Sequence, residues 1–205
     1  MGITPYRNSA FNKLYNLLFC DDAALLRQSN GQTMTYPWNL LTSTGPSIEE
    51  LKKLNTDKTA GTRAQILAAN LLAASGHSLG SKDLMGVVIE VGLENGLDVL
   101  AAYKDGTARY INQAEKMIVW DSPTMSSQIL IDNLFSAGEK VVNQIGPWKK
   151  PRLSQPANGT VRLSFLVSDG LYFGQGPFEV LSKDAMGGPV IQAATQLMIF
   201  LTAQN

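Results

Sequence analysis

Residues 84–120 read LMGVVIEVGLENGLDVLAAYKDGTARYINQAEKMIVW, and this stretch decides the fold class. Short runs rich in valine, isoleucine, leucine and tyrosine alternate with turn residues, a pattern typical of antiparallel strands. Asn95-Gly96 and Asp105-Gly106 contain residue types that adopt the positive φ angles of tight hairpin turns. The pattern predicts a four-stranded antiparallel meander, with strands at 84–91, 97–103, 107–112 and 116–120.

Further strands and two long helices are expected after this meander. Ser122 followed by Pro123 is a helix start signal, so a helix is predicted over 123–145. A second helix over 185–203 closes the chain, and strands are predicted between the two helices at 161–167, 171–173 and 178–181. The expected fold class is therefore α+β. Its antiparallel sheet has six to seven strands, at about 84–120 and 160–182, packed against these long helices.

The chain before the meander is predicted to be mainly helical. Apolar residues recur at helical spacing over 8–28, and another helix begins at Ser47 with the Ser-x-x-Glu pattern of a capping box. A third helix is expected over 62–74. Residues 1–76 are thus interpreted as an N-terminal helical segment packed on an α+β sheet domain at 77–205, the two forming one structural unit.

The order helix, strands, helix, strands, helix loosely resembles that of profilin-like and roadblock-type modules. The first block of four strands departs from the roadblock order. The resemblance is therefore one of topology, and it implies no particular family or activity.

Composition excludes several classes of function. The chain has 205 residues, 17 of them basic and 17 acidic, so its net charge of zero argues against nucleic acid or anionic lipid as a partner. No apolar run reaches membrane-spanning length and no secretory signal is evident, so we expect a cytoplasmic protein. With one cysteine and one histidine, we expect no intrachain disulfide, no metal site and no cofactor.

Gly76-His77-Ser78-Leu79-Gly80 fits G-x-S-x-G, the nucleophile elbow of serine hydrolases. The serine of such an enzyme needs a separate histidine as its base, and the only histidine lies inside the motif itself. A helical pattern also precedes the motif and a strand follows it, the reverse of the usual context. We therefore expect no catalytic site. The residues considered as candidates are Ser78, alone or with Lys82, Cys20 paired with His77, and Glu90.

Glu90 interrupts an otherwise apolar strand. If the first two hairpins have two-residue loops, Glu90 and Tyr110 share one sheet face. One hypothesis is a polar cluster that binds a small molecule, and the alternative is an ordinary half-exposed face. The cluster would contain Glu90, Tyr103, Arg109 and Tyr110, whereas an acid/base site made only of carboxylates would use Glu90, Asp98 and Glu115.

Two segments are candidates for partner binding. The loop after the middle helix combines Trp148 with Lys149, Lys150 and Arg152, which suits recognition of an acidic partner or a connector that covers the core edge. The last helix carries no charge, and Ile199 and Phe200 widen its apolar stripe. Either the N-terminal helices or a second copy of the chain would cover it.

The leading hypothesis is a non-enzymatic protein-interaction or scaffold module that self-associates as a homodimer. The alternative is a small-molecule-binding protein, or a hydrolase with an atypical site.

Overall fold

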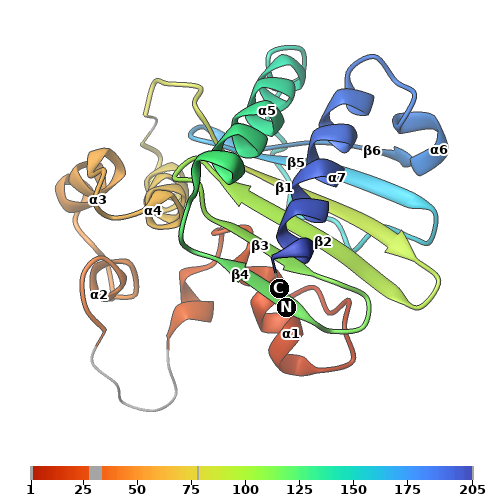
Figure 1. Cartoon of the computed structure of the whole chain (residues 1–205). Helices are drawn as coiled ribbons and strands as arrows, with labels where there is room; N and C mark the ends of the chain where they lie inside the picture. The colour runs from red at the N-terminus through yellow and green to blue at the C-terminus, as the bar shows by residue number, and fades with distance from the viewer. Residues whose placement is uncertain (1, 28–33, 78, 205) are drawn as a thin grey trace.

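The computed structural model describes residues 2–27, 34–77 and 79–204. A six-stranded antiparallel sheet in the order β4-β3-β2-β1-β5-β6 forms its central layer (Figure 1). The α+β prediction is confirmed, as is the four-stranded meander that makes up two thirds of the sheet. The strands are β1 (Leu84–Leu93), β2 (Gly96–Tyr103), β3 (Ala108–Ile111), β4 (Met117–Trp120), β5 (Thr160–Val167) and β6 (Gly170–Pro177).

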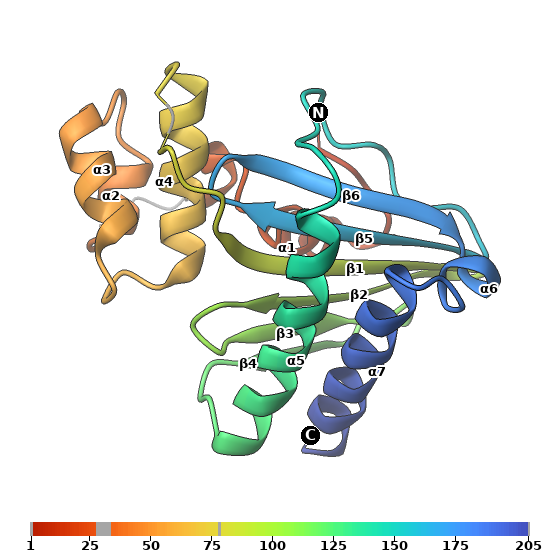
Figure 2. The same ribbon diagram turned by 90° about the horizontal axis from the view of Figure 1, so that it is seen from above.

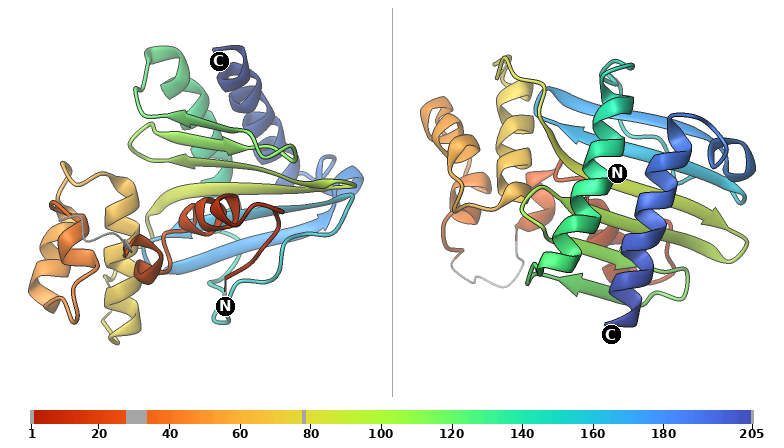
Figure 3. Two further views of the ribbon diagram at one scale, coloured as in Figure 1. Left: turned by 90° about the horizontal axis from the view of Figure 1, so that it is seen from below. Right: turned by 45° about the horizontal axis from the view of Figure 1, so that its top comes forward.

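Two long helices, α5 and α7, lie side by side across one face of the sheet (Figure 2). The N-terminal helix α1 lies against the opposite face, and α2 to α4 gather beyond one end of the strands (Figure 3). A 3-10 turn, η1, follows α1. The bounds are α1 (Ser9–Leu17), η1 (Ala23–Leu26), α2 (Trp38–Leu41), α3 (Ile48–Thr56), α4 (Thr62–Ala74), α5 (Met125–Val142), α6 (Phe178–Leu181) and α7 (Gly187–Ala203).

Each face of the sheet buries its own apolar cluster. On one face, alternate strand residues such as Val87 pack with Leu134 of α5 and Leu197 of α7. On the other, residues such as Val88 pack with Tyr15 and with side chains of the N-terminal segment. Because successive strand residues point to opposite faces, both layers are needed to cover a sheet whose strands are apolar on both sides.

Local signals predicted several helix boundaries. The hydroxyl of Ser47 accepts a hydrogen bond from the backbone N–H of Glu50, whose carboxylate accepts from the Ser47 N–H, so the capping box is present. Helix α4 has the predicted bounds, and Gly76 follows it with a φ of 79°. A positive φ suits glycine and ends the helix there.

Other boundaries were predicted wrongly. The helix expected over 8–28 ends at Leu17, and Cys20 has a φ of 51°, which a continuing right-handed helix cannot accommodate. Helix α5 begins at Met125 with Thr124 as its cap, rather than at 123, because Thr124 accepts from the backbone N–H of Ser127. No helix was predicted between residue 28 and Ser47, yet the short helix α2 lies there.

The strand expected over 178–181 is the helix α6, so the sheet has six strands and not seven. Its neighbour β6 pairs with β5 along its whole length, and the pairing ends where Thr160 meets Pro177. No partner strand remains beyond that point, so residues after Pro177 turn into a helix. The observed strand order does not confirm the resemblance to profilin-like modules.

The prediction that Glu90 and Tyr110 share a face is wrong. The first hairpin has the expected two-residue loop, since Leu93 pairs with Gly96. In the second hairpin Ala102 pairs with Ala108, and three residues, 104–106, form the loop. That one extra residue shifts the register and moves Tyr110 to the face that carries α5 and α7.

The apolar last helix was expected to be covered either by the N-terminal helices or by a second copy of the chain. The N-terminal helices do not cover α7. They lie on the other side of the sheet (Figure 3), and α7 packs inward on the sheet and sideways on α5. Within the part of the chain that the structure describes, no helix is both long and apolar enough to cross a membrane.

Candidate functional site

An apolar pocket of about 190 Å³ lies between α7 and the end of the sheet that carries the β1–β2 hairpin. Helices α5 and α7 cover the middle of this face, and the strands extend beyond α7 (Figure 3). Phe178 of the short helix α6 adds to the wall of the pocket there. The apolar lining comes from Ile89, Val91, Leu93, Leu100, Phe178, Ile191, Ala194 and Met198, and the polar lining from Asp98, Tyr110 and Thr195.

Two periodicities place these side chains together. Residues two apart on a strand point to the same face, which brings Ile89, Val91 and Leu93 into one row. On α7, Ala194 lies about one turn from both Ile191 and Met198, so the three form a stripe along the pocket side of the helix. The pocket is therefore built on rigid elements and not on loops.

Two of the three polar side chains of the pocket, Asp98 and Tyr110, meet at its rim. The Tyr110 hydroxyl donates a hydrogen bond to one Asp98 carboxylate oxygen over 2.7 Å, and the Gln113 backbone N–H donates to the other over 2.7 Å. Burial and the neighbouring Asp98 raise the pKa of Tyr110, so its hydroxyl stays protonated and remains a donor. Among the ion pairs of the described residues, none includes Asp98.

Another hollow, of about 540 Å³, lies among loops near the N-terminus and the strand turns. Its walls include Arg7, Asn95 and Glu115, and the Glu115 carboxylate already accepts from the backbone N–H of Arg7 and Asn8. Small apolar ligands favour enclosed apolar walls with a few polar groups. The pocket beside α7 fits that description better than this polar hollow does.

Glu90 lies on the opposite face, and it is fully buried rather than half exposed. Tyr15 donates to one of its carboxylate oxygens over 2.7 Å, and a guanidinium nitrogen of Arg162 lies 3.5 Å from the other. Burial raises the pKa of Glu90, and the two partners oppose that shift. Arg162 also donates to Gln175 and to the carbonyl oxygens of Leu153 and Ser154, so this pair is engaged by other groups of the same chain.

The polar cluster expected around Glu90 is not assembled. Arg109 lies on the Glu90 face, but its guanidinium donates to Asp121 and to carbonyl oxygens of the chain. Tyr103 donates to the carbonyl oxygen of Leu18. The three carboxylates considered for acid/base chemistry are likewise dispersed, since Asp98 faces α7 and Glu115 lies in the β3–β4 turn.

The cysteine and histidine have different environments. The Cys20 thiol is buried, and burial raises its pKa to about 11. His77 is exposed, and its Nδ1 lies 3.0 Å from the carbonyl oxygen of Ser75. Ser78 lies outside the described residues. Lys82, its possible partner, donates to the carbonyl oxygen of Val142 over 2.8 Å.

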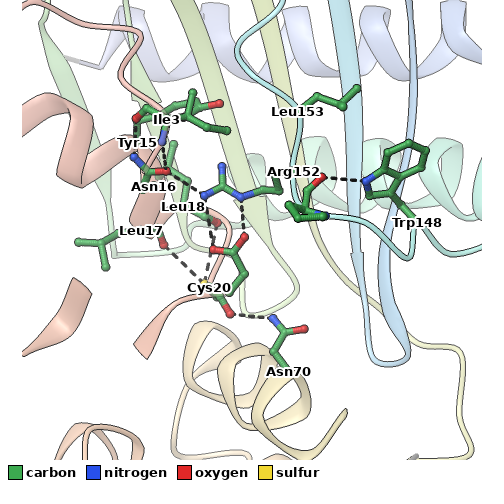
Figure 4. A network of polar contacts seen from close by, with 12 residues as sticks. Ile3, Tyr15, Asn16, Leu17, Leu18, Cys20, Asn70, Trp148, Arg152 and Leu153 are labelled. Atoms are coloured by element: carbon green, nitrogen blue, oxygen red, sulfur yellow. Dashed lines mark hydrogen bonds and ion pairs between the residues drawn. The ribbon is translucent and has the colours of Figure 1, made fainter. Parts of the chain in front are cut away.

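Arg152, a candidate either for contact with an acidic partner or for a connector that covers the core edge, is used within the chain (Figure 4). Its guanidinium pairs with Asp21, donates to the Asn16 side chain over 2.9 Å and stacks 4.0 Å from the centre of the Phe19 ring. It thus ties the loop after α5 to the N-terminal segment. One of its nitrogens, Nη1, is buried with no hydrogen-bond partner among the described residues.

The other predicted partner-binding residues are distributed over two places. Trp148 donates to the carbonyl oxygen of Pro151 over 3.0 Å and packs edge-on against Phe173, while the exposed Lys150 places its amine near the Trp148 ring. Lys149 is exposed beside them. Ile199 is 56% exposed on α7, whereas Phe200 is half buried and packs edge-on against Trp120.

Sequence reasoning missed the pocket itself. Asp98 and Tyr110 were both considered, but for a site on the other face. The one available signal was the apolar width of the last helix, which a single sheet contact does not explain.

No protein-family model, curated protein or solved structure matches this chain.

Proposed function

We propose that this protein is a binding module that takes a small apolar group into the pocket beside α7. The observation that carries the proposal is a preformed, apolar-walled space of about 190 Å³ with two polar side chains fixed at its rim. A dry cavity of about 150 Å³ in another protein is large enough to bind benzene. The present pocket therefore has room for a ring or a chain of about six carbons.

Binding, rather than catalysis, is supported by the state of the reactive groups. The Tyr110 hydroxyl and the Asp98 carboxylate are hydrogen-bonded to each other, and the Cys20 thiol is buried on the other side of the sheet with a raised pKa. A nucleophile needs exposure and an activating partner.

1-Hexanol is a suitable probe for this proposal. Burying its chain provides about 0.8 kcal/mol per methylene, and losses on association offset most of that gain, so a dissociation constant of roughly 1 mM is expected. Titration calorimetry measures it. Ala194→Leu adds three carbons inside the pocket and should weaken binding at least about fivefold.

Ala203→Leu is the matched control, because it makes the same change at an exposed position at the end of α7. It should leave the dissociation constant within about twofold. Thermal unfolding of both variants checks that they remain folded. No measurable binding to the unmodified protein, or equal binding by both variants, would refute the proposal.

Self-association is a second candidate function, and one observation favours it. The outward side of α7 bears Gln192, Gln196 and Ile199, and this helix has no charged residue. An uncharged helix face with an exposed isoleucine suits an isologous contact with a second copy. Sedimentation of the protein and of Ile199→Glu tests it: a dimer that Ile199→Glu dissociates supports the candidate, and a monomer at all concentrations eliminates it.

A further inference from the structure

The pocket beside α7 carries a single charge. Among the described residues that line the pocket, Asp98 is the only acidic or basic one. Every other side chain there is apolar or uncharged. Each Asp98 oxygen accepts one hydrogen bond, from Tyr110 or from the Gln113 backbone, and a carboxylate can accept about four. The carboxylate is therefore held in place with capacity for further donors.

This charge selects among ligands of equal size. A neutral ligand that covers the rim removes water from the Asp98 carboxylate and provides few hydrogen bonds in exchange. An anionic ligand is repelled by this carboxylate. A protonated amine supplies both an opposite charge and N–H donors, which make the stronger class of hydrogen bond. The chemistry of the rim thus complements a cation.

The depth of the carboxylate indicates how such a ligand lies. Asp98 is half buried near the hairpin turn, while Leu100, Ile191 and Ala194 are buried and form the inner wall. The ligand's amine would lie at the rim and its apolar tail inside. A lysine side chain from another protein would place its amine innermost, which is the reverse order, so a free amine fits better.

Building on the proposed function, we propose that the pocket binds a short primary alkylammonium ion. Its chain of about six carbons fills the apolar space, and its ammonium group pairs with Asp98 at the rim.

Three probes of one chain length test the inference by titration calorimetry: hexylammonium, 1-hexanol and hexanoate. Hexylammonium should bind about tenfold more tightly than 1-hexanol, and hexanoate should be weakest. Nα-acetyl-lysine methylamide, a mimic of a protein lysine, should bind more weakly than hexylammonium. Equal binding of hexylammonium and 1-hexanol, or tighter binding of the lysine mimic, overturns the inference.

Asp98→Asn keeps the shape and removes the charge. It should reduce the preference for hexylammonium over 1-hexanol to below about twofold. Asp132→Asn removes the same charge from the exposed side of α5 and should preserve the preference. If Asp98→Asn does not fold, salt provides the test on the unmodified protein. About 0.5 M NaCl should weaken hexylammonium binding severalfold and leave 1-hexanol unaffected.

These outcomes separate the two claims. Binding of 1-hexanol with no amine preference refutes the present inference and leaves the proposed function standing. Failure of every probe to bind refutes both.

Discussion

Replacing Tyr15 by phenylalanine tests the energetics of the buried carboxylate directly. The change removes the hydroxyl that donates to Glu90 and keeps the ring, which packs edge-on against Phe19. A hydrogen bond to a charged group contributes about 1.5–3 kcal/mol, and one between neutral groups about 1 kcal/mol. The cost of Tyr15→Phe should therefore be about 1 kcal/mol when Glu90 is protonated and about 2–3 kcal/mol when it is ionised.

The sign of the pH dependence follows from the pKa of Glu90. Burial raises this pKa above its ordinary value of 4.5, so the folded state retains the proton to higher pH than the unfolded state. The stability that the Glu90 carboxyl contributes therefore falls as the pH rises from its pKa in the unfolded state towards its pKa in the folded state. The Tyr15 hydroxyl lowers the Glu90 pKa, so Tyr15→Phe raises that pKa further. The variant therefore loses stability over a wider range of pH.

Urea unfolding of the protein and of Tyr15→Phe between about pH 4 and pH 9 measures the difference in the free energy of unfolding. The difference should grow with pH, and it should be pH-independent in a Glu90→Gln background. Tyr36→Phe is the matched control, because Tyr36 donates to Asp57 on the exposed surface and should cost less than about 0.5 kcal/mol. A Tyr15→Phe cost that does not change with pH would refute this account of the Glu90 site.

Three further outcomes are expected. A thiol reagent at about pH 8 should leave Cys20 unmodified in the folded protein and react after unfolding, because burial raises the pKa of this thiol to about 11. Rapid labelling of the folded protein would contradict this. Gly92→Ala should cost about 1–3 kcal/mol in urea unfolding, because an added Cβ would overlap the backbone carbonyl of Ala157, and an unchanged midpoint would argue against that close contact. The control Gly174→Ala, on another strand with open space around it, should be neutral within about 0.5 kcal/mol.

Much of the architecture was predictable because its signals are local. The two-residue length of the first hairpin loop and the Ser47 capping box depend on residues a few positions apart, and both are present, although the loop is Glu94-Asn95 rather than Asn95-Gly96. The second hairpin shows where such reasoning fails. Asp105-Gly106 correctly marked a turn, but its sequence did not distinguish a two-residue from a three-residue loop. That single residue reverses the face of every side chain that follows on β3.

The candidate site depended on information that is not local. Glu90 resembles a residue of a half-exposed strand until Tyr15, 75 positions earlier, is placed over it. The pocket beside α7 likewise depends on where the helix crosses the sheet, and no run of residues encodes that position by itself. The uncharged last helix did indicate an unusual environment, although it did not show that one flank faces a pocket.

The central claim is that the space between α7 and the β1–β2 hairpin receives an apolar ligand. Intermolecular nuclear Overhauser effects between 1-hexanol and protein methyl groups test it most directly. The account predicts cross-peaks from the ligand chain to Ile89, Ala194 and Met198, and their loss in Ala194→Leu. Cross-peaks only to the exposed methyls of Val180 or Ile199 would contradict it.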